Sequence, residues 1–312
     1  MRNNSSANII LPGATLGVFG GGQLGRMFAH AAMRLGYRVV VFTPEANSPA
    51  GQVAHEEIVA PYEDEAAVER FARQCDAVTL EFENVPVAAA EIAARHTVLR
   101  PGAAVLGIAQ DRLAERAFLD RFGFPTAAHR AVRSAEELAR AVAQLGTPCV
   151  VKSARLGYDG RGQVRLNDAS EVEAAWRTLN VDEALCEAWV SYYCELSVLV
   201  ARSPDGAVET FGPIENRHAR HILDVSTVPA AVSPDMQREA IELARKVAER
   251  IDLEGLICVE MFHTTDGGLV INELAPRPHN SGHLTIEACA VSQFEQQVRA
   301  VCNLPLTPMT LR

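Results

Sequence analysis

The stretch VINELAPRPHNSGH, residues 270–283, decides how the fold of this chain can be predicted. It begins as a short apolar run that is typical of a buried strand, and the run delivers a carboxylate, Glu273, near its end. Prolines, an arginine, histidines, an asparagine and a glycine follow, with almost nothing apolar among them, so this loop cannot build a hydrophobic core. Polar groups held rigidly at a strand end are typical of active-site loops on a strand-built scaffold.

A second apolar strand, residues 256–262, precedes this stretch and also carries one acid, Glu260. The turn at 266–268, Asp-Gly-Gly, predicts that the two strands form a hairpin. Two neighbouring apolar strands with one carboxylate each suit a hard cation, which prefers oxygen ligands. The alternative is that each glutamate lies at a solvated strand end, because charged side chains are mostly exposed.

Length and composition limit the classes of protein to which the chain can belong. Its 312 residues, 48% hydrophobic and 22% charged, are ordinary for a soluble protein of about two or three domains. The net charge of −10 disfavours a nucleic-acid-binding protein, although a few local basic residues would suffice for a phosphorylated substrate. No apolar run approaches the roughly 18 residues that cross a membrane, so no membrane partner is expected.

Seven cysteines occur without any Cys-x-x-Cys spacing, and most have apolar neighbours in the sequence. This pattern indicates reduced, buried thiols and not disulfides or a zinc site. The first six residues have no apolar signal core behind them and are expected to form a loose tail. We therefore expect a cytoplasmic protein.

The first third of the chain alternates between strand and helix patterns. Strands are expected at 16–19, 37–42, 77–82 and 97–99, with helices at about 26–35, from Asp64 and from Pro86. This alternation predicts an α/β fold that begins with a doubly wound parallel sheet.

The glycine loop GGGQLG, residues 20–25, lies between the first strand and the first helix. It fits a dinucleotide-binding pattern with Glu45 as the later acid, although Glu45 lies past Thr43-Pro44 instead of ending the second strand. The alternative is a simple tight turn, for which glycine is also suited. In either case the helix start favours an anion.

The third expected strand ends in EFENVP, residues 81–86, with Glu81 and Glu83 on one pleat face. Strand carboxyl ends line the ligand crevice in an open α/β sheet, so these acids are candidate ligand-binding residues. A solvated strand end is the alternative.

A second glycine loop, GYDGRGQ at 157–163, follows a strand that ends on Lys152. It has no Gly-Lys-Ser/Thr and no helix behind it, so it is not a Walker motif. A strand, a glycine loop and a second strand are typical of a flap whose amides fold over phosphates, and Lys152 would suit a polyphosphate. An ordinary hairpin is the alternative. Helices are further expected at 101–122, after the Ser134 capping box, and at 233–250, 281–290 and 293–302.

Taken in order, these motifs resemble the ATP-grasp superfamily. The two glycine loops, residues 81–86 and residues 272–283 resemble in particular the family of 5-(carboxyamino)imidazole ribonucleotide synthases of purine biosynthesis, over about residues 16–306. The resemblance implies an N-terminal α/β domain at 1–108 and a two-part ATP-grasp domain, with a lid at 109–190 and a metal-bearing part at 191–312.

The reaction implied by the resemblance uses ATP to phosphorylate bicarbonate to carboxyphosphate. The exocyclic amine of 5-aminoimidazole ribonucleotide is then carboxylated, which gives ADP and phosphate. The implied cofactors are ATP and Mg²⁺, the partners are small molecules, and a homodimer is compatible with the family.

Roles for individual residues follow from the resemblance alone. ATP would be held by Arg112, Lys152, Gly157, Tyr158, Asp159, Gly160, Arg161, Gly162, Gln163, Glu187, Ala188, Trp189, Val190, Glu195, His218, Asn272 and Glu273. Mg²⁺ would be held by Glu260 and Glu273. Bicarbonate and carboxyphosphate would contact the catalytic residues Arg277, His279 and Asn280. The ribonucleotide would contact Gln23, Leu24, Glu81, Tyr158, Asp159 and Arg161.

Members of the family continue beyond the position of Arg312 into a segment expected to add basic residues to the ribonucleotide phosphate site. Three other interpretations stay open. They are a formate-dependent glycinamide ribonucleotide transformylase, which the loop at 276–283 argues against, a nicotinamide dehydrogenase, and a nucleotide-binding relative without catalytic activity.

Overall fold

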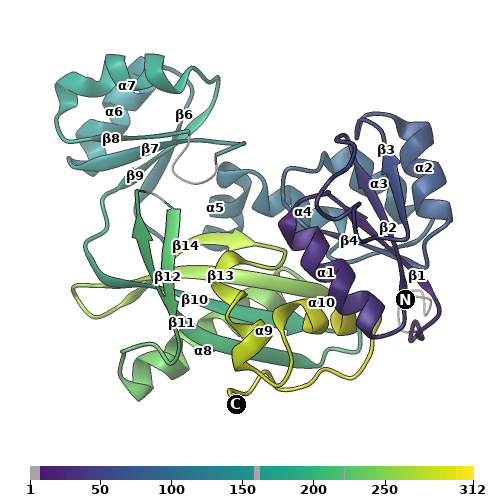
Figure 1. The fold of residues 1–312 in the computed structure, drawn as a ribbon. Coiled ribbons are helices and arrows are strands. Elements are labelled where there is room, and N and C mark those ends of the chain that lie inside the picture. The colour runs from purple at the N-terminus through teal and green to yellow at the C-terminus, as the bar shows by residue number, and fades with distance from the viewer. Residues whose placement is uncertain (1–7, 158–161, 221) are drawn as a thin grey trace.

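The computed structural model describes residues 8–157, 162–220 and 222–312. These residues form three sheets, each with its own hydrophobic core (Figure 1). Figure 1 shows the sheet of β6 to β9 at the upper left, the sheet of β1 to β5 at the right and the sheet of β10 to β14 below and between them. The fold is α/β, as the alternation of strands and helices predicts.

The first sheet is fully parallel and has the strand order β3-β2-β1-β4-β5. Its strands are β1 (Thr15–Phe19), β2 (Arg38–Thr43), β3 (Glu56–Val59), β4 (Ala77–Leu80) and β5 (Val98–Leu99). The edge strand β3 was not predicted, because its sequence EEIV has no apolar alternation and both of its end residues are exposed. The expected doubly wound parallel sheet is confirmed.

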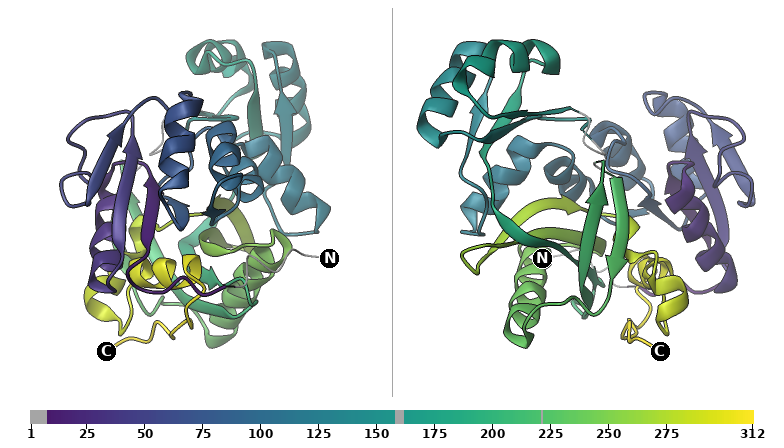
Figure 2. Two further views of the ribbon diagram at one scale, coloured as in Figure 1. Left: turned by 90° about the vertical axis from the view of Figure 1, so that its right-hand side faces the viewer. Right: turned by 60° about the vertical axis from the view of Figure 1, so that its left-hand side comes forward.

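Helices cover both faces of this sheet. On one face α2 (Glu65–Arg73) and α3 (Val87–Ala94) pack against β1, β2 and β4. On the other face α1 (Gln23–Arg34) packs beside α10 (Gln293–Val301), a helix from the far end of the sequence. Figure 2 shows α10, coloured yellow, alongside the purple α1. The last helix therefore belongs in space to the first sheet.

The β6 to β9 sheet is antiparallel, with the order β6-β9-β7-β8 and two helices against it. Its elements are β6 (His129–Val132), α6 (Ala135–Leu145), β7 (Cys149–Ser153), β8 (Gln163–Leu166), α7 (Val172–Leu179) and β9 (Ala184–Ala188). Ser134 caps α6 as predicted, because its hydroxyl accepts from Glu137 N, but the Glu137 carboxylate accepts from Arg133 N and not from Ser134 N, so the return bond of a capping box goes to the residue before the cap.

The β10 to β14 sheet is antiparallel, with the order β12-β11-β10-β13-β14. Its strands are β10 (Tyr192–Arg202), β11 (Val208–Ala219), β12 (Ile222–Thr227), β13 (Gly255–Thr264) and β14 (Leu269–Ala275), and α8 (Pro234–Arg250) packs on it. The predicted hairpin is confirmed, and its register places Glu260 directly opposite Glu273. The register shift next to Glu260 is a β-bulge.

Two predicted helices were wrong. The expected helix at 101–122 is two helices, α4 (Ala103–Ala109) and α5 (Arg112–Arg121), because the Asp111 side chain accepts from Leu113 N and Ala114 N and so starts a new helix. The expected helix at 281–290 is a short 3-10 turn at Asn280–Gly282 followed by the four-residue α9 (Thr285–Ala288). In this loop the His279 ring bonds to the Ser281 hydroxyl, which also bonds to the Ser197 hydroxyl of β10, and such side-chain bonds compete with helix formation.

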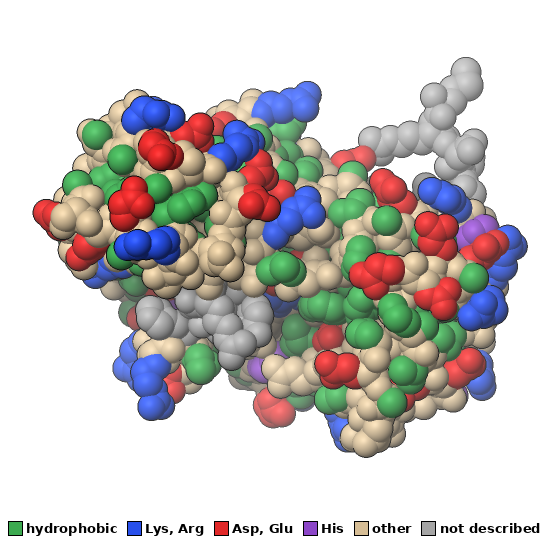
Figure 3. Space-filling model, turned by 90° about the horizontal axis from the view of Figure 1, so that it is seen from above, with side chains coloured by type: hydrophobic (Ala, Val, Ile, Leu, Met, Phe, Trp, Pro, Cys, Tyr) green, Lys and Arg blue, Asp and Glu red, His purple; other side chains and the backbone are tan. Residues whose placement is uncertain are grey.

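Within the described residues, no helix combines the length and apolar character needed to cross a membrane. All seven cysteines are free thiols, and every one except the half-buried Cys194 is buried. On the face seen from above, acidic and basic side chains are interspersed (Figure 3).

Candidate active site

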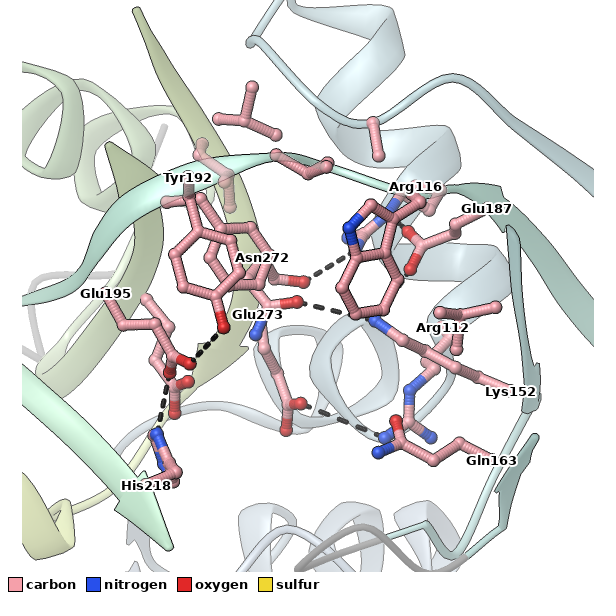
Figure 4. Close-up of a pocket in the computed structure, with 18 of the residues that line it drawn as sticks. Arg112, Arg116, Lys152, Gln163, Glu187, Tyr192, Glu195, His218, Asn272 and Glu273 are labelled. Carbon is pink, nitrogen blue, oxygen red and sulfur yellow. Dashed lines mark hydrogen bonds and ion pairs between the residues drawn. The ribbon is translucent and has the colours of Figure 1, made fainter. Parts of the chain in front are cut away.

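A cavity of about 730 Å³ lies between the β6 to β9 sheet and the β10 to β14 sheet (Figure 4). Fifteen residues chosen from the sequence line it: Arg112, Lys152, Gln163, Glu187, Ala188, Trp189, Val190, Glu195, His218, Glu260, Asn272, Glu273, Arg277, His279 and Asn280. They come from both sheets, from α5 and from the loop after β14. The structure therefore gathers most of the predicted site residues around one space.

Lys152 and Arg116 share the buried carboxylate of Glu187 at one end of this cavity. Lys152 Nζ lies 2.6 Å from Glu187 Oε2, and Arg116 Nε donates to Glu187 Oε1 at 2.8 Å. Burial alone would raise the pKa of Glu187, but Lys152 and Arg116 outweigh it and hold this pKa at about 2. The carboxylate thus keeps its charge and orients Lys152 in the cavity.

Arg116 was missed in the sequence analysis, although it lies four residues after Arg112 and so on the same face of α5. Arg116 Nη2 donates to Asn272 O at 2.5 Å, and the neighbouring Glu115 carboxylate accepts from Leu274 N at 2.7 Å. Helix α5 therefore holds the backbone of β14 on both sides of Glu273. Arg165, Tyr192 and Phe262 also line the cavity and were not predicted.

A second polar group lies across the cavity from Lys152 (Figure 4). The Glu195 carboxylate accepts from Tyr192 Oη at 2.9 Å and lies 2.7 Å from His218 Nδ1. The hydrogen bond to Glu195 raises the pKa of His218. Nearby, the Arg165 guanidinium lies 3.9 Å from the centre of the Trp189 ring.

Glu260 and Glu273 present two carboxylates side by side, because directly opposed residues of an antiparallel pair have neighbouring Cβ atoms. Burial raises the pKa of Glu273, Arg112 opposes this and the charge of Glu260 adds to it. Glu260 Oε1 lies 2.8 Å from His279 Nε2, and His279 outweighs burial to hold the pKa of Glu260 at about 2. Two like charges on one face form an arrangement that a cation would stabilise.

The residues present fit Mg²⁺ and do not form a complete metal cage. Among the described residues, no group of three or more His, Cys, Asp or Glu side chains could hold a metal by itself. Mg²⁺ is commonly held by one or two carboxylates, with substrate phosphates and water as its other ligands. The pair of Glu260 and Glu273 supplies that minimum.

The Arg277 guanidinium lies between the loop after β14 and the end of β4. Its Nε and Nη2 donate to the two oxygens of Glu83, and its Nη1 donates to Pro278 O at 3.0 Å. These bonds use three of the five N–H donors of an arginine. Among the described residues, the other two N–H donors, one on each Nη, have no partner, so they are available to a planar, carbonate-like anion.

The first glycine loop is explained by Glu81 and not by a dinucleotide. The Glu81 carboxylate accepts from Gly22 N at 2.7 Å and from Gly25 N at 3.0 Å, so this side chain takes the amides at the start of α1. A Cβ on Gly20 would lie 2.2 Å from Glu81 Cγ, and one on Gly22 would lie 2.7 Å from Glu81 Oε1. The dinucleotide interpretation is therefore wrong, and the glycines provide space for the carboxylate.

Some predicted site residues lie outside the main cavity. Gln23 is exposed at the start of α1, Leu24 is buried in the core beneath it, and Glu81 is buried at the end of β4. In the second glycine loop, Gly157 O accepts from Arg112 Nη2 at 3.2 Å, and Gly162 has a φ of 67°. Tyr158, Asp159, Gly160 and Arg161 lie outside the described residues.

The pKa of Glu187 predicts a specific dependence of stability on pH. A folded-state pKa of about 2, below the ordinary 4.5, contributes about 3 kcal/mol that is present above pH 4.5 and lost as the pH falls towards 2. We expect Glu187→Gln to be less stable than the parent by roughly that amount at neutral pH. The difference should close as the pH falls from 4.5 to 2, as urea unfolding at a series of pH values would measure.

Glu183→Gln is the matched control, because Glu183 pairs with Arg133 on the surface and should change stability little. A stability difference between Glu187→Gln and the parent that does not vary with pH would contradict a charged Glu187.

Two family models match the chain. The ribonucleotide synthetase preATP-grasp domain matches residues 13–110, and the ATP-grasp domain matches residues 117–294. The chain is 45% identical over 301 residues to N5-carboxyaminoimidazole ribonucleotide synthase of Bacillus subtilis. The aligned region covers 96% of this chain and 79% of the relative.

Solved structures give the same result. The crystal structure of an ADP complex of an N5-carboxyaminoimidazole ribonucleotide synthetase has a TM-score of 0.94 and 45% identity, over 97% of this chain and 81% of that one. The synthase from Aspergillus clavatus, in complex with ADP and 5-aminoimidazole ribonucleotide, has a TM-score of 0.90 and 34% identity, over 96% and 80%.

The parallel preATP-grasp sheet, the cavity between two antiparallel sheets and the matching family models define an ATP-grasp ligase. Within that class, the chain belongs to the family of N5-carboxyaminoimidazole ribonucleotide synthases, the expected family under its other name. These enzymes use ATP to carboxylate 5-aminoimidazole ribonucleotide in purine biosynthesis.

Proposed function

We propose that the cavity is where this chain binds ATP for the carboxylation of 5-aminoimidazole ribonucleotide. The base would lie against the backbone of residues 187–190, next to the apolar side chains of Val150 and Phe262 in the lining. Glu195, held by Tyr192 and His218, would accept from the ribose hydroxyls. Arg112, Lys152, Asn272 and the loop at 157–163 would face the phosphates, where cations and amide donors are needed.

Mg²⁺ would be held by Glu260 and Glu273, and it would neutralise charge on the transferring phosphoryl group. Lys152 and Arg112 would add fixed positive charge at the same place. Phosphoryl transfer needs little covalent help from the protein and depends mainly on positioning and charge. This requirement fits the ion pair that holds Lys152 and the charge-assisted hydrogen bonds that hold the backbone of β14.

The loop after β14 would hold bicarbonate through Arg277, His279 and Asn280. An oxygen of bicarbonate attacks the γ-phosphorus, the bond to the β-phosphate oxygen breaks, and ADP leaves with carboxyphosphate formed. The amine nitrogen of the ribonucleotide then bonds to the carboxyl carbon as phosphate departs, and the amine loses a proton. The remaining N–H donors of Arg277 would suit the planar anion in both steps.

The ribonucleotide would bind beside Glu81 and Gln23, with Tyr158, Asp159 and Arg161 from the flap. The Glu81 carboxylate already accepts from two amides, but each oxygen keeps a second lone pair for a substrate donor. Leu24 is buried, so its side chain would support this site by packing. We also propose a cytoplasmic location, because the precursors of purine synthesis are small soluble molecules.

The observation that carries this proposal is that the Glu260–Glu273 pair, Lys152 and Arg277 all line one cavity. We expect ADP release to require bicarbonate and to rise several-fold, by about threefold or more, when 5-aminoimidazole ribonucleotide is added, because capture of the carboxyl group removes the intermediate. A coupled ADP assay with each substrate omitted in turn measures this. ATP binding without ADP release would indicate a non-catalytic relative.

A further inference from the structure

Helix α10 carries three glutamines that are almost completely buried. Gln293 and Gln296 are 0% exposed and Gln297 is 1% exposed. Buried amides are costly unless they are hydrogen-bonded, and every side-chain amide atom of the three except Gln297 Oε1 has a partner among the described residues. The partners lie in three different parts of the fold.

Gln293 holds the backbone of His279, in the loop proposed for bicarbonate. Its Oε1 accepts from His279 N at 3.0 Å, and its Nε2 donates to His279 O at 2.8 Å. The two bonds fix both backbone polar groups of one residue. The amide therefore sets the position of the loop without using the His279 ring, which contacts Glu260.

Gln297 holds the end of β4, next to the residue proposed for the ribonucleotide. Its Nε2 donates to Thr79 Oγ1 at 3.0 Å and to Leu80 O at 3.2 Å. Glu81 follows directly in the sequence. Because Gln293 and Gln297 are four residues apart, they lie on one face of α10, about 6 Å from each other along the axis.

The rest of α10 fixes the helix itself between the two sheets. Phe294 and Val298 pack in the core of the first sheet with Phe28 of α1, and Ala300 packs against Ala201 and Leu256 of the β10 to β14 sheet. Because α10 packs against both sheets, it holds them in a fixed position relative to each other. Through this one packed helix, the two glutamines connect the loop proposed for bicarbonate with the strand end proposed for the ribonucleotide.

We infer that Gln293 and Gln297 are positioning residues that set the distance between the ribonucleotide amine and carboxyphosphate. The inference rests on the proposed roles of Glu81 and His279. Correct spacing lets the amine capture the carboxyl group before water does. When spacing is lost, carboxyphosphate and water give bicarbonate and phosphate, and ATP is consumed without product.

The test is the ratio of ADP released to carboxylated ribonucleotide formed, measured in parallel for the parent and for Gln297→Met. Methionine keeps the length of the side chain and removes the amide. In the parent we expect one ADP for each product. In Gln297→Met we expect product formation to fall by about ten- to a hundredfold, because small displacements are costly to oriented reactions. Bicarbonate-dependent ADP release without the ribonucleotide should stay near the parent value.

Gln296→Met is the matched control from the same helix. Gln296 is equally buried, but its amide bonds to Thr307 N and O, away from both the bicarbonate loop and the end of β4. Its loss should lower stability without changing the ratio. If Gln297→Met does not fold, Thr79→Val is the substitute, because it removes the hydroxyl that accepts from Gln297 Nε2. Thr79→Val should also raise the ratio of ADP released to product formed.

Two results would overturn the inference: one-to-one coupling in folded Gln297→Met or Thr79→Val, or equal uncoupling in Gln296→Met. A parent enzyme that forms no carboxylated product would instead contradict the proposed function, so the two failures can be distinguished.

Discussion

Glu273→Gln is expected to lower ATP turnover by about a thousandfold or more, which corresponds to about 4 kcal/mol of transition-state stabilisation. The amide has nearly the shape of the carboxylate but is a poorer ligand for Mg²⁺. The Mg²⁺ concentration needed for half-maximal rate should also rise. Initial rates across a Mg²⁺ titration would measure both effects.

The fold should not suffer from this change. Burial and the charge of Glu260 raise the pKa of Glu273, so the ionised carboxylate lowers the stability of the folded protein. The neutral amide of glutamine does not have this effect. We therefore expect a thermal midpoint equal to or above that of the parent. Glu239→Gln, an exposed acid on α8, is the control and should change neither property. Full activity in Glu273→Gln would show that this residue holds no metal.

Arg277→Lys is expected to lower kcat/KM for bicarbonate by about a hundredfold or more, because two charge-assisted hydrogen bonds are worth about 1.5–3 kcal/mol each. Lysine keeps the charge but loses the planar fork that can bond Glu83 and a carbonate-like anion together. ATP affinity should hardly change, because the proposed nucleotide contacts are elsewhere. Steady-state kinetics with bicarbonate varied, and nucleotide binding by calorimetry, separate these effects.

Glu83→Gln is the companion variant for this experiment. It leaves the guanidinium in place and weakens only the bond that orients it. The loss in kcat/KM for bicarbonate should therefore be smaller, roughly tenfold. If Arg277→Lys instead raised the KM for ATP and spared bicarbonate, Arg277 would belong to the nucleotide phosphates.

Local sequence signals were sufficient for much of the fold and of the candidate site. The hairpin that pairs Glu260 with Glu273 follows from two apolar runs and an Asp-Gly-Gly turn between them. The parallel first sheet follows from strand and helix alternation, and β7, the strand that carries Lys152, follows from its apolar pattern. These features depend on residues close together in the chain, so periodicity and turn chemistry predict them.

Weak local signals were the cause of the missed elements. The strands β3 and β6 have four residues each, with charged or polar residues and no apolar alternation, and β12, ILDVST, has only a brief alternation of Leu223 and Val225 with polar residues. The break between α4 and α5 depends on a single cap, Asp111, inside a stretch of good helix formers. The assignment of individual residues to ATP, Mg²⁺, bicarbonate or the ribonucleotide stays a prediction.

The sequence by itself determined most of the strands and helices in their order, and most of the residues that face the cavity. Only the tertiary structure decided which of them act together. The pair of Arg277 with Glu83 is 194 positions apart, and the bond from Gln297 to Thr79 spans 218. The packing of α10 on the first sheet and the hold of Arg116 on β14 are likewise long-range. Such contacts arise when separate hydrophobic faces are buried against each other, and no local pattern records which faces will meet.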